Sequence, residues 1–295
     1  MKDLSIEVLA PAKVNLSLAI TEKRTDGFHG LQTVFQTISL YDRIQVSLSG
    51  KGIICDCGDL SGENNLAYQA AKAFLEAHQK REVHYQQTGV KIQIEKKIPS
   101  QAGLGGGSSD AAAVLRAMNH LYSDSLSYEE MLQCAKRCGS DTAFFLRGGT
   151  QWGEGTGTTL TDLPSGPEMN LILVKPLGGV STGEAYRTFD ETGEYGSLDK
   201  ELWVDLLKNK DICKIGQNLT NSLESAAFKL LPEIEYIKKL LLEKGCYGAL
   251  MSGSGSVVFG ILHGQEQGET IASELAQKVN CTVWLAKTIG PLSDI

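Results

Sequence analysis

The chain has 295 residues, of which 42% are hydrophobic and 21% charged, so it is long and apolar enough to bury a sizeable core. Its 28 basic and 35 acidic residues give a net charge of −7, which argues against a general nucleic-acid binder or a basic membrane-surface protein. No apolar run approaches the roughly 18 residues of a membrane-spanning helix. Residues 1–9 lack the apolar core of a signal peptide, and the seven thinly spread cysteines fit reduced thiols. We therefore expect a cytoplasmic protein of two domains.

The first half of the chain is expected to form strands followed by helices. Residues 12–20 alternate, which places Lys13, Asn15 and Ser17 on the polar face of a strand, towards water or a cleft. Ser127 and Glu130 have the spacing of a capping box. The same periodicities predict strands at residues 31–40, 43–48 and 90–94, and helices at residues 65–77, 109–121 and from 127 to near 139.

The second half has a different order of elements. An apolar strand at residues 169–174 comes first, and the helices that follow are expected at residues 198–207, 219–231 and 233–244. The remaining elements are strands at residues 247–251 and 256–262, a helix at 269–278 and a strand at 282–286. This order is that of a split βαβ, ferredoxin-like unit. The sequence therefore predicts an α+β protein with an N-terminal domain over residues 1–160 and a C-terminal domain over residues 161–295.

A glycine-rich loop at residues 99–107 runs through Ser108 and Ser109 into an alanine-rich helix. Glycines let the backbone approach a ligand closely, and a helix N-terminus offers free N–H groups and the positive end of its dipole. Together they predict an anion site suited to a phosphate chain. The loop lacks the Gly-Lys-Ser/Thr of a Walker A motif and is a poor dinucleotide fingerprint. The alternative is a flexible turn in which Ser108 or Ser109 is an ordinary N-cap.

The loop and three other segments resemble, in sequence and in order, the GHMP small-molecule kinases. The segments lie at residues 11–16, 99–110, 139–144 and 251–255 and span nearly the whole chain. The resemblance implies a two-domain fold, with a ribosomal-protein-like N-terminal domain that binds ATP and a ferredoxin-like C-terminal domain. Residues 23–29 and 36–42 are most similar to the branch that phosphorylates the 2-hydroxyl of a cytidylyl-linked methylerythritol in the non-mevalonate route to isoprenoids. The alternative is another GHMP kinase, acting on homoserine, mevalonate or a sugar.

The resemblance also assigns site residues. It implies that Asp141 is the general base and that Lys13 is the neighbouring cation, which favours the ionised carboxylate and steadies the transferring phosphoryl group. Without the resemblance, Asp141 would be taken for a turn cap. The nucleotide site is implied at Pro99, Ser100, Gln101, Ala102, Gly103, Leu104, Gly105, Gly106, Gly107, Ser108, Ser109, Asn65 and Lys96.

The resemblance implies a substrate site at Phe28, His29 and Tyr186, and Asn15 is added to it because it shares the strand face of Lys13. His29 is expected to contact the edge of cytosine, with Phe28 and Tyr186 as stacking rings. Phe28 stands where the family usually has Tyr, which keeps the stacking and loses a hydroxyl contact. Asn15 is expected either to bond the substrate or to orient Lys13.

The expected co-substrate is ATP with Mg²⁺, and no prosthetic group is expected. Ser108 and Ser109 are candidate magnesium ligands, and no other metal site is predicted, because no Cys/His pair at zinc spacing accompanies the cysteine pairs at residues 55–57 and 134–138. The expected partners are ATP and a cytidylyl-linked alcohol, with no nucleic acid and no membrane, on a monomer or homodimer. A non-catalytic nucleotide- or RNA-binding protein is the third hypothesis; the acidic balance and the joint presence of Lys13 and Asp141 argue against it.

Overall fold

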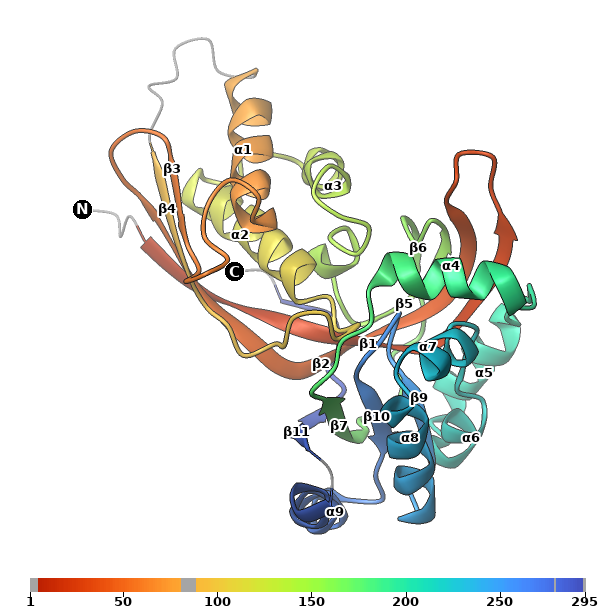
Figure 1. Ribbon diagram of the computed structural model, residues 1–295. Helices are drawn as coiled ribbons and strands as arrows, with labels where there is room; N and C mark the ends of the chain where they lie inside the picture. Colours follow the sequence, from red (N-terminus) through yellow and green to blue (C-terminus); the bar gives the residue numbers. More distant parts are fainter. Residues whose placement is uncertain (1–4, 81–88, 279, 294–295) are drawn as a thin grey trace.

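The computed structural model describes residues 5–80, 89–278 and 280–293 (Figure 1). Residues 1–4 of the segment considered for a signal peptide lie outside this part. The protein has the predicted α+β composition, with two sheets and helices packed against both. None of the described helices combines the length and apolar character needed to cross a bilayer.

The larger sheet has seven strands, in the order β3-β4-β2-β1-β8, with β5 paired to β2 and β6 paired to β5. The strands are β1 (Ser5–Lys23), β2 (His29–Leu48), β3 (Ile53–Asp56), β4 (Val90–Glu95), β5 (Thr150–Gly155), β6 (Thr159–Asp162) and β8 (Thr220–Asn221). The two strands predicted at residues 31–40 and 43–48 are one strand. The register of the β1–β2 pairing shifts between Pro11 and Ala12 of β1. This irregularity lies where the alternating pattern of β2 breaks, and β2 continues through it as one strand.

Helices α1 (Leu66–Gln79), α2 (Gly106–Leu121) and α3 (Tyr128–Lys136) pack together on one face of this sheet, followed by the short η1 (Phe144–Leu146) (Figure 1). The predicted capping box at Ser127 and Glu130 is confirmed. Helix α2 begins earlier than predicted, at Gly106, and its N-cap is Gly105 with φ 70°. The alternative of Ser108 or Ser109 as the N-cap is therefore wrong: both lie inside the first turn, which the left-handed glycine sets up.

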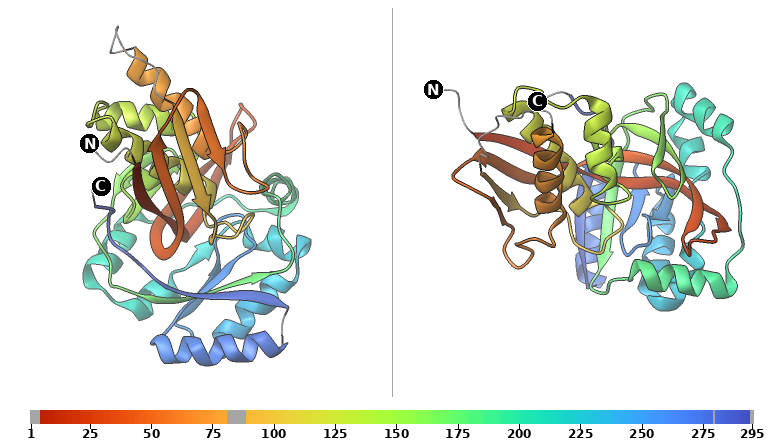
Figure 2. Two further views of the ribbon diagram at one scale, coloured as in Figure 1. Left: turned by 90° about the vertical axis from the view of Figure 1, so that its left-hand side faces the viewer. Right: turned by 90° about the horizontal axis from the view of Figure 1, so that it is seen from above.

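The second sheet has the order β11-β7-β10-β9, and every neighbouring pair in it is antiparallel. Its strands are β7 (Asn170–Pro176), β9 (Gly248–Met251), β10 (Val258–Ile261) and β11 (Cys281–Lys287), and α8 (Glu233–Glu243) and α9 (Gln265–Lys278) pack against it. Strands β7 and β9 run parallel with β10 between them, which is the split βαβ arrangement that the sequence predicts. Figure 2 shows this sheet and α9 on the far side of the long β1–β2 pair from α1 and α2.

Between β7 and β9 the chain forms α4 (Thr182–Thr192), α5 (Lys200–Asn209), α6 (Ile212–Gln217) and α7 (Glu224–Leu230). Helix α4 is not predicted by the sequence pattern. The helix predicted at residues 219–231 is also wrong in its first part, because Thr220 and Asn221 instead form β8 and pair with Ser17 and Leu18 of β1. The Asn221 amide donates to the backbone oxygens of Met251 and Gly253, so long-range contacts hold this segment extended.

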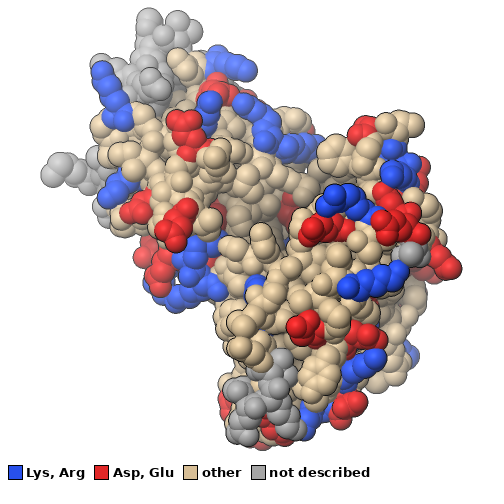
Figure 3. All heavy atoms as spheres, viewed as in Figure 1, with Lys and Arg blue, Asp and Glu red and all other residues tan. Residues whose placement is uncertain are grey.

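The buried hydrophobic residues that the structure describes form three clusters, and two of these contain residues of both sheets. Leu16 of β1 and Trp152 of β5 belong to the same buried cluster as Leu171 of β7 and Phe259 of β10. Figure 3 shows the molecular surface hollowed between the part that carries α1 and α2 and the part that carries α4. On the face shown, basic and acidic side chains are interspersed over both parts.

Candidate active site

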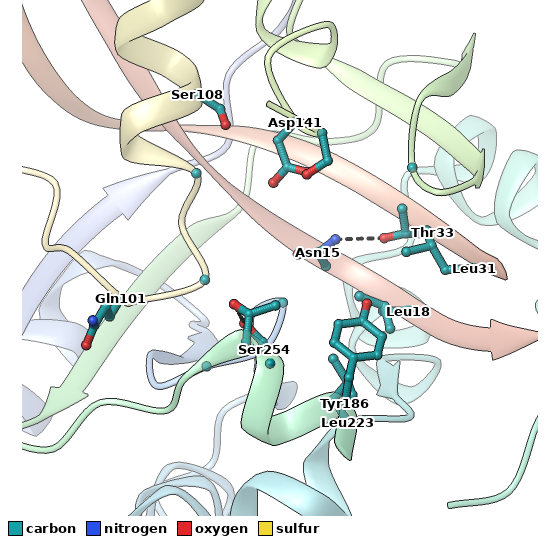
Figure 4. Close-up of a pocket in the computed structure, with 18 of the residues that line it drawn as sticks. Asn15, Leu18, Leu31, Thr33, Gln101, Ser108, Asp141, Tyr186, Leu223 and Ser254 are labelled. Atoms are coloured by element: carbon teal, nitrogen blue, oxygen red, sulfur yellow. Dashed lines mark hydrogen bonds between the residues drawn. The ribbon is translucent and has the colours of Figure 1, made fainter. Parts of the chain in front are cut away.

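A cavity of about 1480 Å³ lies beside the β1–β2 pair. It is lined by the β1–β2 hairpin, the glycine-rich loop, the start of α4 and the segment 253–255 (Figure 4). These elements come from distant parts of the chain, so the cavity exists only in the folded protein.

Backbone contacts hold the glycine-rich loop in the cavity wall. The N–H of Lys13 donates to the carbonyl of Leu104 at 3.0 Å, and the hydroxyl of Ser252 donates to the carbonyl of Gly103 at 2.9 Å. Gly103 has φ 72°, and a Cβ added to it would lie 1.9 Å from the backbone carbonyl oxygen of Ser252. The close approach of the two segments therefore requires glycine at this position. The loop brings the N-terminus of α2 to the cavity, where free backbone N–H groups and the positive end of the helix dipole favour an anion.

The ammonium of Lys13 lies beside the carboxylate of Asp141, at 3.4 Å from Nζ to Oδ2. The side chain of Lys13 is only 4% exposed and that of Asp141 is 24% exposed, so a substrate can reach the carboxylate while the lysine stays buried. Lys13 donates to Asn15 Oδ1 at 2.7 Å, and the Asn15 amide donates to Thr33 Oγ1 at 2.7 Å (Figure 4). Of the two roles expected for Asn15, the structure contains the hydrogen bond that orients Lys13.

A second lysine, Lys96, lies at the start of α2. Its ammonium donates to Asp110 at 2.6 Å and to Asp42, which also accepts the N–H groups of Lys97 and Ile98. Burial raises the pKa of Asp110 to about 8, although Lys96 opposes this shift. Asp110 Oδ1 has no hydrogen-bond partner within the described part of the chain, which fits a carboxyl that keeps its proton. Burial would lower the pKa of Lys96, but its interactions with Asp110 and Asp42 outweigh burial and raise it.

The opposite end of the cavity is aromatic. The ring of His29 stacks on that of Tyr186 with centroids 4.8 Å apart and planes at 30°. Phe28, at the tip of the β1–β2 hairpin, is 66% exposed. Burial, and next the charge of Asp141, raise the pKa of Tyr186 to about 12, so its hydroxyl stays protonated. In Figure 4 this ring points from α4 towards β1.

Of the site residues predicted from the sequence, all except Asn65 and Ser109 line this cavity. Asn65 is the N-cap of α1, where its side chain accepts from the N–H of Ala67 and donates to the carbonyl of Leu60. The hydroxyl of Ser109 is buried and donates to the carbonyl of Pro11 at 2.6 Å. Both side chains serve the fold in this structure.

The cavity also contains residues that the sequence reasoning missed. Lys23 lies in the segment that carries the resemblance, but nothing in that segment singles it out. Asp190, Thr182 and Arg187 belong to α4, which the pattern did not predict. No local sequence pattern points to Asp190, because its partner His29 is 161 residues away in the chain.

Two family profiles match the chain: "GHMP kinases N terminal domain" at residues 65–149 and "GHMP kinases C terminal" at residues 203–281. A 4-diphosphocytidyl-2-C-methyl-D-erythritol kinase from Desulfitobacterium hafniense (strain Y51) is 48% identical over 96% of this chain and 96% of that protein. The chain belongs to this family of GHMP kinases. A second family member, from Acetivibrio thermocellus, is 39% identical over 89% of this chain and 92% of its own length.

Solved structures agree with the assignment to the 4-diphosphocytidyl-2-C-methyl-D-erythritol kinase family. The crystal structure of a 4-(cytidine 5'-diphospho)-2C-methyl-D-erythritol kinase has a TM-score of 0.82 and 35% identity, covering 97% of this chain and 100% of that one. The homoserine kinase of Cytophaga hutchinsonii, with a TM-score of 0.74 and 22% identity over 99% of this chain and 98% of that one, shares the fold. The expectation of a GHMP fold and of an ATP-dependent kinase is confirmed.

Proposed function

We propose that this chain transfers the γ-phosphoryl group of ATP to the 2-hydroxyl of 4-diphosphocytidyl-2-C-methyl-D-erythritol, in the methylerythritol phosphate route to isoprenoid precursors. The observation that carries the proposal is one cavity that joins three parts: the glycine-rich loop, the Lys13–Asp141 pair and the aromatic end at His29 and Tyr186. The relatives named above support the same substrate. We place the reaction in the cytoplasm, where the seven free cysteines stay reduced.

The chemistry needs positioning more than covalent help. The glycine-rich loop and the N-terminus of α2 hold the phosphates of ATP by backbone N–H groups. Asp141 accepts the proton of the substrate's 2-hydroxyl. The oxygen of that hydroxyl forms a bond to the γ-phosphorus while the bond from the γ-phosphorus to ADP breaks. The Lys13 ammonium, held by Asn15, stabilises the negative charge that develops on the transferring group.

The residues at the phosphate end fit a magnesium ion. Mg²⁺ takes one or two oxygens from the protein and the rest from phosphates and water, and the cavity offers the Ser108 hydroxyl. When bound, the ion neutralises the charge on the phosphate oxygens of ATP. Ser109, the other candidate ligand, is turned towards Pro11.

The aromatic end would take the cytosine. Phe28 and Tyr186 supply ring faces for stacking, and His29 supplies a polar edge at the same place. Phe28 offers no hydroxyl, so selection of the base falls to His29 and its neighbours.

The test is ATP-dependent release of ADP by the purified protein with the diphosphocytidyl substrate, beside homoserine, mevalonate and galactose. Turnover with the cytidylyl substrate alone is the expected result. Turnover with one of the other alcohols would keep the fold and the roles of Lys13 and Asp141 and overturn the assignment of the substrate.

A further inference from the structure

Asp190 links His29 to Lys23 at the aromatic end of the cavity. Its Oδ1 lies 2.6 Å from His29 Nε2, and its Oδ2 lies 2.6 Å from Lys23 Nζ. The carboxylate comes from α4, whereas its two partners flank the tip of the β1–β2 hairpin. The side chain of Asp190 is 21% exposed and that of His29 is 7% exposed. The nearly buried ring of His29 is therefore hydrogen-bonded to a charged side chain that lies closer to the solvent.

The ring of His29 is held on several sides. Tyr186 stacks on one face, and the edge of Phe189 approaches at 6.4 Å between centroids. Both aromatic residues lie on α4, close to Asp190 along the helix. The same helix therefore sets both the plane of the ring and the partner of Nε2.

These contacts determine which ring nitrogen carries the proton. Hydrogen bonds from Lys23 and then from His29 lower the pKa of Asp190, so this carboxylate is ionised and can only accept. In its neutral form His29 therefore donates from Nε2, which leaves Nδ1 as a hydrogen-bond acceptor. Nδ1 has no partner among the residues that the structure describes, and His29 lines the cavity.

We propose that Asp190 is a positioning residue that keeps His29 protonated on Nε2, so that Nδ1 accepts a hydrogen bond from the exocyclic amino group of the substrate's base. The inference rests on the proposed function, because it assumes that the base binds at His29. Cytosine carries an amino group at this position, and uracil carries a carbonyl oxygen. An acceptor on the protein pairs with the first and repels the second, so Asp190 would make the enzyme select cytidylyl over uridylyl substrates.

The substitution Asp190→Asn tests the proposal, because a residue with only a structural role would not change the preference between the two bases. Lys23 can only donate, so the new amide turns its oxygen to Lys23 and its NH₂ group to His29. That arrangement moves the ring proton to Nδ1, which becomes a donor. We expect KM for the cytidylyl substrate to rise about tenfold, with KM for ATP unchanged, and the preference over the uridylyl counterpart to collapse.

Two further variants separate charge from orientation. Asp190→Ala removes the hydrogen-bond acceptor from His29 Nε2, so neither position of the ring proton is enforced. We expect this variant to weaken the preference for cytosine without creating a preference for uracil. Glu191→Gln removes an exposed carboxylate from the next position of α4 and is the matched control, with kinetics like those of the wild type. An unchanged ratio of cytidylyl to uridylyl efficiency in Asp190→Asn would overturn the proposal.

The position of the ring proton is measured independently of activity. In protein with ¹⁵N-labelled histidine, at mildly alkaline pH, the resonances of His29 are assigned by comparison with His29→Gln. We expect an unprotonated Nδ1 in the wild type and a protonated Nδ1 in Asp190→Asn. A protonated Nδ1 in the wild type would overturn the role of Asp190. Absence of turnover with the cytidylyl substrate would instead overturn the proposed function, while the ring measurement still decides what Asp190 does to His29.

Discussion

Within the site, two aspartates next to lysines have different surroundings and different expected roles. Asp141 is partly exposed in the cavity at 3.4 Å from Lys13, whereas Asp110 is buried against Lys96 with one oxygen unpartnered in the described part of the chain. The first is placed to exchange a proton with a substrate. The second is placed to hold the start of α2 and the loop before it.

Asp141→Asn is expected to lower kcat by about 10²–10⁴-fold, because an amide cannot accept the hydroxyl proton. ATP affinity should change little, because in the proposed function the loop and the N-terminus of α2 supply most of the contacts to ATP. ADP-release kinetics and calorimetric titration with ATP measure the two effects. The control is Asp162→Asn, a surface carboxylate paired with Arg147. Turnover at the wild-type rate in Asp141→Asn would refute the general-base assignment.

Asp110→Asn is expected to change how stability depends on pH. The pKa of Asp110 is raised from 3.8 to about 8 by burial, so the folded protein keeps a proton that the unfolded chain releases. Stability from this group is therefore complete below about pH 4 and is lost as the pH rises towards about 8. The asparagine variant lacks this loss, so its stability should improve relative to the wild type over that range.

Urea unfolding at a series of pH values measures the difference. Asp56→Asn, at an exposed position of β3, is the control for removing a carboxylate from the surface. A pH-independent difference between Asp110→Asn and the wild type would show that Asp110 is ionised in the folded protein over this range.

Among the elements, the glycine-rich loop is the one whose shape depends most on a neighbour. Gly103 has φ 72°, and a Cβ added to it would clash with the backbone carbonyl oxygen of Ser252. Gly58 has φ 56°, and a Cβ added to it would meet nothing within 4 Å. Gly58→Ala tests the strain of a left-handed backbone alone, about 1–2 kcal/mol. Gly103→Ala adds a clash with backbone that cannot move aside.

We expect Gly103→Ala to cost more stability than Gly58→Ala and to raise KM for ATP, which Gly58→Ala should leave unchanged. Thermal unfolding and ADP-release kinetics on both variants check this. Equal losses of stability with unchanged KM in both would mean that the loop does not depend on its contact with Ser252.

For the whole molecule, the shared core predicts that the two sheets unfold together. Leu16 and Trp152 of the first sheet pack in one cluster with residues of the second, and β8 joins β1 through the segment anchored by Asn221. Tryptophan fluorescence and far-UV circular dichroism should therefore report one coincident transition in denaturant. Two separate transitions would contradict the prediction.

Asn221→Ala probes the same connection. Its amide bonds the carbonyls of Met251 and Gly253, and its oxygen accepts from the N–H of Leu223. Leaving these buried groups unpaired should cost about 1–3 kcal/mol in the free energy of unfolding. The loss should be seen equally by both probes. A loss confined to one of them would show that the two sheets are not coupled here.

The sequence by itself determined what depends on neighbours along the chain. Alternation predicted the cavity-facing side of β1 with Lys13 and Asn15, the spacing of Ser127 and Glu130 predicted the start of α3, and the clustered glycines predicted a phosphate loop. These features follow from the period of a strand, the chemistry of a cap and the freedom of glycine, which act within a few residues. The same alternation was wrong for Ser17, which is buried and is not part of the cavity lining, because the register of β1 shifts between Asn15 and Ser17.

Only the tertiary structure decided what depends on distant partners. The bulge that makes β2 one strand is set by its pairing with β1, and the extended Thr220–Asn221 is set by contacts with β1 and the 251–253 segment. Asn65 and Ser109 were expected to bind nucleotide, yet their hydrogen bonds go to the fold. The pairing of His29 with Asp190 likewise required α4 to reach the hairpin tip. Such contacts join residues far apart in the chain, and their energies depend on packing that no local pattern encodes.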